Sequence, residues 1–221
     1  SIRLSDPRRP PEWFLAIYSG TTLGTYYYVA SALCDLMRAT FDEHRIHCTP
    51  LRSSGVGDNI QLMNSGQAQA VMVQSDTNYN AAIGIRPIPQ ARSGLSLHAE
   101  TGVMVVHPGA GIDSLEDLIG KRVNIGADGS GTQELWLQLL SENNIEIEAI
   151  GQVYRGTQDN NVRALCDGSI DAFGTWIGHP STLVASAIKR CGARVIGMSG
   201  PGTTKIIKDN ESNFLMTDYI L

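Results

Sequence analysis

An alternation of strand-like and helix-like segments, with a polar loop after each apolar strand, constrains the fold most. Residues 13–18 (WFLAIY) form a short apolar run that ends at Ser19 and Gly20, which is the pattern of a buried strand. Residues 25–45 then carry apolar side chains at helical spacing. This succession repeats along the chain, and it predicts an α/β fold with mainly parallel sheets.

The same patterns predict the other elements. Strands or extended segments are expected at residues 46–51, 70–74, 94–106, 121–126, 152–155, 170–175 and 193–198. Helices are expected at residues 57–65, 75–82, 115–119, 130–143, 160–167 and 180–190. A loop-like stretch at 84–100 breaks the rhythm and indicates a crossing between two lobes, and a second crossing is expected near 197–202. The expected lobes are therefore 1–100 plus 197–221 (lobe I) and 101–196 (lobe II).

Four polar loops follow expected strands, at residues 19–27, 53–59, 74–76 and 126–132. Ligands of open α/β sheets bind at the carboxyl ends of the strands, so these loops are the candidate site. Their glycines let backbone N–H groups approach a ligand, and the helix that follows each loop favours an anion at its N-terminus. The alternative for each loop is a turn or helix cap with no ligand.

The loop at 126–132 (GADGSGT) is the most informative of the four. Gly126 and Gly131 have P-loop spacing, but Thr132 stands where that motif needs a lysine, and the dinucleotide pattern G-x-G-x-x-G also fails. The remaining interpretation is a small anion nest with Ser and Thr hydroxyls, suited to a carboxylate. A cap that serves only its own helix is the alternative.

Charge and residue pattern argue against several function classes. The 221 residues carry a net charge of −5, whereas a nucleic-acid protein normally shows a basic face. The five histidines are scattered, G-x-S-x-G is absent, and no carboxylate pair or metal cluster stands out. The residues therefore argue against an enzyme and against a nucleic-acid partner. No apolar run approaches the length of a membrane span, and the polar, Pro-rich start does not resemble a signal peptide, as in a mature chain whose leader has been removed.

The four cysteines form two local pairs, Cys34 with Cys48 and Cys166 with Cys191. Each pair brackets a helix and the strand after it, two elements that pack side by side in α/β units. Each pair could form a bridge that stabilises the fold by roughly 3 kcal/mol. The alternative is four reduced, buried thiols.

Four longer motifs occur in order along the chain. They are SGTTLGTYYYVASALC (19–34), RSSGVGDNIQLMNSGQAQAVMVQSD (52–76), GIDSLEDLIGKRVNIGADGSGT (111–132) and RALCDGSIDAFGTWIGHPS (163–181). Together they resemble the TAXI family, the extracytoplasmic solute-binding proteins of TRAP transporters. The resemblance implies a two-lobed fold of the type II periplasmic-binding-protein kind, in which the lobes close on a ligand. It also implies a periplasmic monomer that delivers a small organic acid, such as glutamate or a 2-oxoglutarate-like carboxylate, to membrane permease subunits. The resemblance further implies no catalytic activity and no cofactor.

Carried over motif by motif, the resemblance implies a ligand site with two walls. The lobe I wall consists of Thr21, Thr22, Tyr26, Ser53, Asn59, Gln74, Ser75 and Asp76. The lobe II wall consists of Gly129, Ser130, Gly131, Thr132 and Trp176. The nest would bind a carboxylate, amides of Asn59 and Gln74 would face it, and Asp76 would cap its helix or hold an ammonium group. The family's cysteine pairs match those of this chain.

Two features depart from the family. Family members continue well beyond residue 221 and add elements to lobe I, so lobe I is expected to be incomplete at the C-terminus. Asp128 lies inside the anion nest, where it would repel a dianion unless it points away or receives an amine. Arg155, in a nearby loop, is a further candidate charge partner. A ligand-sensing domain of a signalling protein is the alternative function with the same fold.

Overall fold

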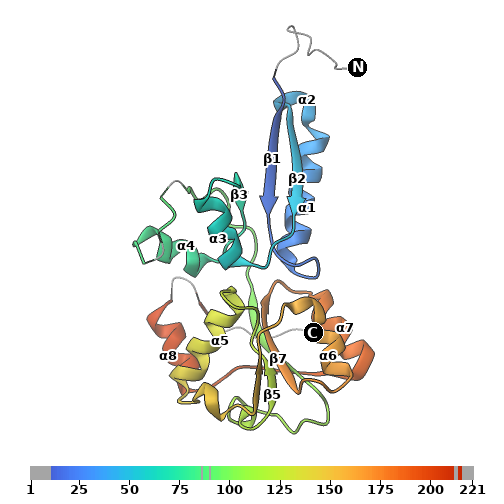
Figure 1. Ribbon diagram of the computed structural model, residues 1–221, viewed down its shortest axis with the longest axis vertical. Helices are drawn as coiled ribbons and strands as arrows, with labels where there is room; N and C mark the ends of the chain where they lie inside the picture. Colours follow the sequence, from blue (N-terminus) through green and yellow to red (C-terminus); the bar gives the residue numbers. More distant parts are fainter. Residues whose placement is uncertain (1–10, 86, 90, 212–213, 216–221) are drawn as a thin grey trace.

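The computed structural model describes residues 11–85, 87–89, 91–211 and 214–215 as two lobes, each with its own sheet (Figure 1). The strands are β1 (Trp13–Tyr18), β2 (Ile46–Leu51), β3 (Ala70–Val71), β4 (Thr101–Val106), β5 (Arg122–Asn124), β6 (Gln152–Tyr154), β7 (Ala172–Ile177) and β8 (Arg194–Ile196). The α-helices are α1 (Thr25–Ala39), α2 (Phe41–His44), α3 (Val56–Asn64), α4 (Ser75–Ala82), α5 (Gly131–Glu142), α6 (Asn161–Cys166), α7 (Thr182–Cys191) and α8 (Pro201–Asp209). This mixed α/β architecture confirms the predicted fold class.

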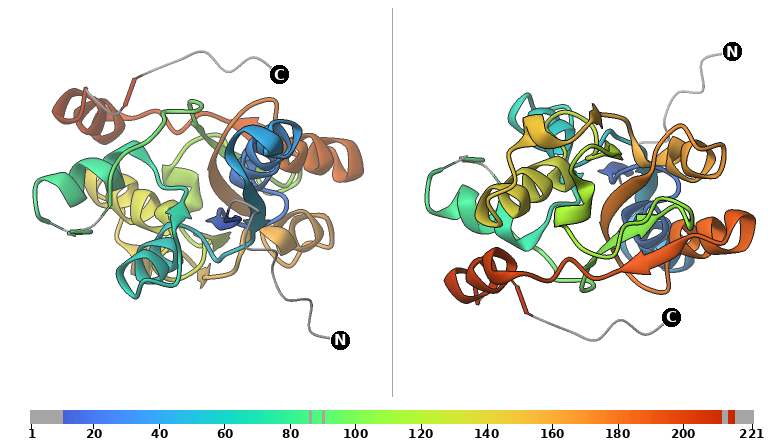
Figure 2. Two further views of the ribbon diagram at one scale, coloured as in Figure 1. Left: turned by 90° about the horizontal axis from the view of Figure 1, so that it is seen from above. Right: turned by 90° about the horizontal axis from the view of Figure 1, so that it is seen from below.

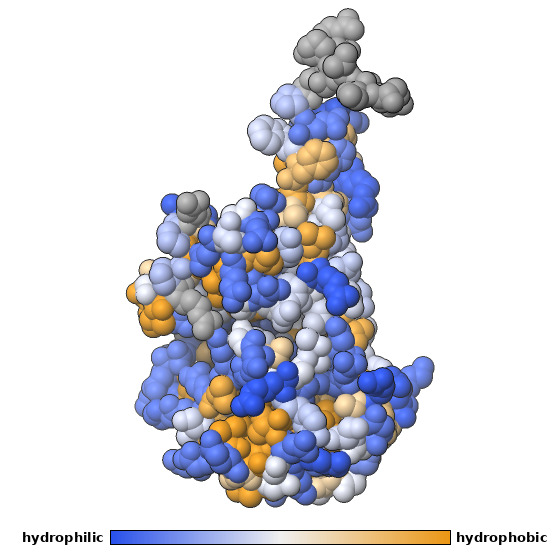
Figure 3. Space-filling model, in the orientation of Figure 1, coloured by the Kyte–Doolittle hydropathy of each residue, from blue (hydrophilic) through white to orange (hydrophobic). Residues whose placement is uncertain are grey.

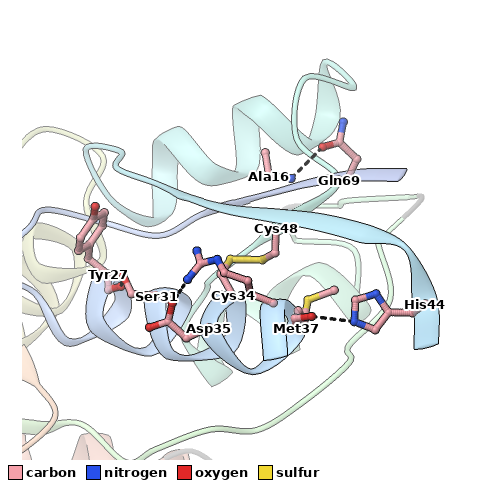
Figure 4. The surroundings of a disulfide bond; sticks show 10 residues. Ala16, Tyr27, Ser31, Cys34, Asp35, Met37, His44, Cys48 and Gln69 are labelled. Carbon is pink, nitrogen blue, oxygen red and sulfur yellow. Dashed lines mark hydrogen bonds and ion pairs between the residues drawn. A yellow bond between two sulfur atoms is a disulfide. The ribbon is translucent and has the colours of Figure 1, made fainter. Parts of the chain in front are cut away.

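Lobe I is built on a parallel sheet of order β2-β1-β3. Strand β1 pairs with β2 along six positions, from Trp13 opposite Ile46 to Tyr18 opposite Leu51, but with β3 only at its last two. Helix α1 lies along the β1–β2 pair, and Cys34 in α1 forms a disulfide with Cys48 in β2 (Figure 4). The lobe's core is small, and its buried members are Ile17, Ala30, Cys34 and Met72.

The prediction of a buried strand at 13–18 is wrong for its first half. Trp13 is 64% exposed and Phe14 is 76% exposed, and the burial of β1 increases toward its carboxyl end. The β1–β2 pair projects away from lobe II with α1 beside it, and α3 and β3 stand near its lower end only (Figure 1). The first residues of β1 therefore lack the neighbours that would cover them.

The sheet of lobe II has the order β6-β5-β7-β4-β8 and is mixed. Strand β5 pairs in parallel with β6 and β7, whereas β4 pairs antiparallel with β7 and β8. The expectation of mainly parallel sheets thus holds for lobe I but not around β4. The reason is that β4 follows the crossing at 84–100, not a helix of the same lobe, so no right-handed βαβ unit fixes its direction.

Side chains of β4 alternate between two cores, as a strand buried on both faces requires. Met104 and Val106 pack on one face with Trp136 of α5, and Val103 and Val105 pack on the other with Leu165 of α6. Figure 2 shows the same division: α5 and α8 lie on one side of the sheet, and α6 and α7 lie on the other.

Helix α8 has no counterpart among the predicted elements. It packs on α5, and its Ile206 belongs to the same core as Trp136 and Met198. Asn143, which follows α5, accepts from the backbone N–H of Gly202 with its Oδ1 (3.1 Å). The division of the chain at residue 197 stays a prediction, and these contacts favour extending lobe II through α8.

Both expected cysteine pairs are disulfides, with Cα–Cα separations of 4.9 Å for Cys34–Cys48 and 5.3 Å for Cys166–Cys191. The first joins a helix to the following strand, as predicted. The second joins the last residues of α6 and α7, two packed helices, because Cys191 ends a helix before the strand begins.

Candidate functional site

A cavity of about 90 Å³ lies where the two lobes meet. At roughly 10–15 Å³ per water, it has room for about six to nine water-sized groups, the size of a small metabolite. The residues that line it are Gly20, Thr21, Gly24, Thr25, Tyr26, Ser54, Gly55, Val56, Gln74, Glu100, Gly126, Ala127, Ser130, Gly131, Thr132, Thr157, Gln158, Trp176 and Ile177.

Four helices begin at this cavity. The N-cap residues of α1, α3, α4 and α5 are Gly24, Gly55, Gln74 and Ser130, and all four line it. The first N–H groups of a helix have no partner within the helix, and the helix dipole places partial positive charge there. Of these caps, only Ser130 makes a side-chain cap hydrogen bond. The site therefore offers backbone donors and positive potential from both lobes.

The loop before α5 is shaped by glycine. Gly126 and Gly129 have φ angles of 99° and 72°, in the left-handed region that other residues rarely adopt. A Cβ on Gly126 would also lie 2.9 Å from the Ser130 Oγ. This tight turn brings the Ser130 hydroxyl over the helix end, where it accepts from the N–H of Gln133 (3.2 Å). The cap interpretation of this serine is thus confirmed, and the first residues of α5, Gly131 and Thr132, also line the cavity.

Asp128 does not oppose an anion in this nest. Its side chain is 79% exposed and does not line the cavity. Its Oδ1 accepts from Gln133 Nε2 (2.7 Å) and lies 3.4 Å from Arg155 Nε. Asp128 would therefore not repel an anion in the nest, because its exposed carboxylate lies outside the cavity wall and has the guanidinium of Arg155 as a neighbour. Arg155 pairs with Asp128 and is likewise absent from the cavity wall.

Glu100 is the charged member of the cavity wall, and the sequence analysis missed it. Its side chain is 17% exposed. Its Oε2 accepts from Gln74 Nε2 (3.1 Å) and from the Tyr26 hydroxyl (3.4 Å). Burial, together with the nearby Glu100 and Asp76 carboxylates, raises the pKa of Tyr26, so that side chain stays a neutral donor.

The two lobes touch at glycines. A Cβ on Gly57 of α3 would lie 2.2 Å from the carbonyl oxygen of Gly129, and one on Gly131 would lie 1.9 Å from Gln74 Oε1. On another side of the cavity, Thr25 Oγ1 donates to the carbonyl of Gly178 (3.3 Å). Backbone approach this close needs hydrogen in place of a side chain, so these glycines permit the closed arrangement of the lobes.

Comparison with models of known protein families assigns the chain to a family. A family model described as the NMT1-like family matches residues 17–218. The chain belongs to the NMT1-like family. The finding supports a fold of the type II periplasmic-binding-protein kind, and it does not single out the TAXI family.

Solved structures similar to this NMT1-like chain are mostly binding proteins. The alkanesulfonate-binding protein SsuA from Xanthomonas axonopodis pv. citri, bound to MOPS, is 18% identical with a TM-score of 0.57, over 85% of this chain and 62% of that protein. A protein from Bordetella bronchiseptica RB50 is 19% identical (TM-score 0.63; 89% and 61% covered). An ancestral arginine-binding protein bound to arginine is 16% identical (TM-score 0.57; 90% of both chains). The NMT1-like chain thus spans about three fifths of the first two proteins, and the likeness shows the fold.

About half of the predicted site residues of the NMT1-like chain line the cavity. These are Thr21, Tyr26, Gln74, Ser130, Gly131, Thr132 and Trp176. The others lie outside its wall: Thr22, Ser53, Asn59, Ser75, Asp76 and Gly129. The assignment of all thirteen residues to a ligand site stays a prediction.

Three of these outer residues have structural partners. Asn59 is fully buried, and its Nδ2 donates to the carbonyls of Ser19 (2.8 Å) and Met72 (2.7 Å), which ties α3 to the ends of β1 and β3. Ser53 Oγ accepts from the N–H of Gly55 (3.2 Å), and Asp76 Oδ1 accepts from the N–H of Thr77 (2.7 Å). Burial raises the pKa of Asp76, and the nearby Glu134 and Glu100 raise it further.

The cavity residues that sequence reasoning missed are of three kinds. Ser54, Gly55 and Gly126 stand in loops that were already candidates. Thr157 and Gln158 follow β6, so the strand-end rule could have found them; Gln158 Nε2 donates to Thr132 Oγ1 (3.2 Å). Glu100 had no such signal, because it precedes a strand.

A second hollow, of about 1850 Å³, runs between α1, β3, α4 and α8, with Leu33, Met37 and Met72 in its lining. It adjoins the smaller cavity and shares the lining residues Tyr26, Gln74, Glu100 and Trp176 with it. Figure 3 shows orange apolar patches above and below the boundary between the lobes, which is mostly blue and white. The smaller cavity, at which four helix N-termini meet, is the candidate ligand site. Within the described residues, no helix has the length and apolar character to cross a membrane, and no group of three potential metal ligands was found.

Proposed function

We propose that the chain is an extracytoplasmic solute-binding receptor, which captures a small organic acid between its lobes and delivers it to the membrane subunits of a TRAP-type transporter. The observation that carries the proposal is the convergence of four helix N-termini on one small interlobe cavity. Helix N-termini favour anions, and a carboxylate is the small anionic group that N–H and hydroxyl donors accommodate.

The geometry suggests how the acid would be held. One carboxylate oxygen would accept from the N–H groups of Gly131 and Thr132 in the first turn of α5, and the other from the N-terminus of α1 or α3 across the cavity. A ligand that bridges the lobes binds the closed form more tightly than the open form, and it shifts the population toward closure. The permease would then recognise the closed receptor.

The two disulfides support the location. Such bridges persist in oxidising compartments such as the bacterial periplasm and are rare in the cytosol. The similar proteins SsuA and the ancestral arginine-binding protein are named for binding small solutes, and this supports a receptor and not an enzyme. Two parts of the proposal, TRAP-type transport and the monomeric state, rest on the resemblance of the sequence motifs.

The first test is a thermal-shift screen of carboxylates, amino acids, sulfonates and sugars. A ligand at 100 times its dissociation constant should add about 2.7 kcal/mol to the free energy of unfolding, which is a clear shift in melting temperature. No shift with any acid would contradict the proposal.

Replacement of Ser130 tests the position of the ligand. We expect Ser130→Ala to bind the ligand found in the screen about tenfold more weakly, since the hydroxyl and the order of the first turn of α5 are lost. The chain offers a matched control, because Ser181 caps α7 in the same way and accepts from the N–H of Val184 (3.3 Å). Both variants should lose about 1 kcal/mol of stability. Equal dissociation constants for the two variants by calorimetry would rule out the nest as the ligand site.

A ligand-sensing domain is the second candidate. The effector-binding domain of QuiR in complex with shikimate shares the fold, with a TM-score of 0.58 at 15% identity. Co-purification with membrane permease subunits in the presence of ligand would support the transport receptor, and binding to a signalling protein would support the sensor.

A further inference from the structure

We infer that Glu100 is the residue that sets the ligand class: it binds a cationic group, so the ligand is a zwitterion with an ammonium group opposite its carboxylate. The inference rests on the proposed function and deepens it. It narrows the proposed ligand from any small organic acid to an amino-acid-like molecule with a net charge of zero or −1.

The first support is the charge of the cavity wall. Among the described residues that line the cavity, Glu100 carries the single formal charge, and no lysine or arginine is present. Helix N-termini supply about half a unit of positive charge each, which favours one carboxylate. A second ligand carboxylate near Glu100 would meet a like charge at a partly buried side chain, where the repulsion is stronger than in bulk water.

The second support is the way in which Glu100 is held. Oε2 takes both donors, from Gln74 Nε2 and the Tyr26 hydroxyl, and these two side chains come from different elements of lobe I. The polar neighbour of Oε1 is the ring of His98, whose Nε2 lies 3.8 Å away, which is too long for a hydrogen bond. Oε1 does not belong to the buried polar atoms that lack a partner, so it is accessible and can accept from a ligand donor.

Position distinguishes Glu100 from the other acidic side chains nearby. Asp76 lines the larger hollow alone, whereas Glu100 lines both that hollow and the interlobe cavity, and Asp76 Oδ1 accepts from the N–H of Thr77. Asp128 is exposed and lies beside Arg155. Glu134 does not line the cavity. Glu100 thus has both the location and the unfilled acceptor that an ammonium group needs.

The third support is the short distance between the proposed carboxylate site at the N-terminus of α5 and the proposed ammonium site at Glu100. Ser130 and Thr132, at the N-terminus of α5, belong to lobe II, and Gln74, which positions Glu100, reaches across to Gly131. The carboxylate site and the Glu100 site are therefore neighbours in one cavity. This suits an α-amino acid, in which the two charges are separated by a single carbon.

Matched acids test the inference by calorimetry. The probes are L-glutamate with 2-oxoglutarate, and L-alanine with L-lactate, since the members of each pair differ chiefly at the amine. We expect the wild-type protein to bind the amino acid of at least one pair about 30-fold more tightly than its partner. In Glu100→Gln, which keeps the side-chain volume, that ratio should fall to about threefold or less. Glu134→Gln is the control and should keep the wild-type ratio.

The outcomes separate the two proposals. If wild-type protein binds the oxo or hydroxy acid as tightly as the amino acid, or if Glu100→Gln weakens both members of a pair equally, the inference about Glu100 is wrong and the receptor function stands. If no acid, with or without an amine, binds the wild-type protein, the receptor function itself fails. Melting temperatures of the variants without ligand show whether each one is folded.

Discussion

Replacement of Gly57 by alanine is expected to weaken ligand binding about 100-fold and to leave the protein folded. The new Cβ would lie 2.2 Å from the carbonyl oxygen of Gly129, which belongs to the opposite lobe. The obstacle is backbone, so no side-chain rotation relieves it, and the lobes must stay further apart. Overpacking of this kind typically costs about 1–3 kcal/mol. This cost lowers the population of the closed state, and the apparent affinity for the ligand falls by the same factor.

The same substitution should not harm lobe I by itself. Gly57 is the second residue of α3, and alanine in a helix is more favourable than glycine by about 0.5–1 kcal/mol. A variant with an unchanged or slightly higher melting temperature and a much weaker affinity would therefore indicate blocked closure and not misfolding. The control is Gly109→Ala, where the new Cβ meets only ordinary contacts, 3.5 Å from His107. Unchanged calorimetric affinity in Gly57→Ala would show that binding does not need these lobes to meet.

The second large effect concerns the lobe I disulfide. We expect Cys34→Ala/Cys48→Ala to lower the free energy of unfolding by about 3 kcal/mol and to abolish binding near physiological temperature. Cys34 is itself one of the four buried members of the lobe I core, so its bridge replaces contacts that a larger core would supply. Figure 4 shows the bridge between the middle of α1 and β2, where it holds the helix against the sheet.

The second disulfide provides the comparison. Cys166→Ala/Cys191→Ala opens a loop of similar size, with a sequence separation of 25 against 14, so the chain-entropy effect is about the same. Lobe II, however, has two extensive cores, and we expect it to stay folded and to bind ligand. Circular dichroism melts and amide hydrogen exchange of each variant would measure the difference. Equal loss of binding in both double variants would contradict the dependence of lobe I on its bridge.

Local patterns predicted much of the fold. The bounds of β1, β2 and α4 were predicted to the residue, because an apolar run or a polar cap marks each end. The predicted helix at 25–45 instead divides into α1 and α2 around Thr40, and the left-handed Arg45 (φ 60°) ends it. The antiparallel direction of β4 and the position of α8 depend on which lobe each segment joins. Apolar periodicity carries no such information.

The residues of the candidate site also divide into those that local sequence patterns predict and those that depend on the tertiary structure. Thr21, Gln74 and Ser130 follow strands, as the strand-end rule requires of site residues, and all three line the cavity. Asn59 was an attractive candidate because amides suit ligands, but its amide satisfies two backbone carbonyls inside lobe I. Glu100 contributes to the cavity only because the crossing segment passes between the lobes, and that path is a property of the tertiary structure.

The placement of tryptophan has an optical consequence. Trp176 lines the cavity and packs edge-on against the buried Trp136, with ring centroids 6.1 Å apart, whereas Trp13 is exposed at the far end of β1. Emission from Trp13 is that of an indole in water and serves as a constant background. Any change in the colour or intensity of the protein's natural fluorescence when a solute enters comes from the Trp176–Trp136 pair. The chain thus carries its own reporter of occupancy, and binding can be followed in real time without a dye.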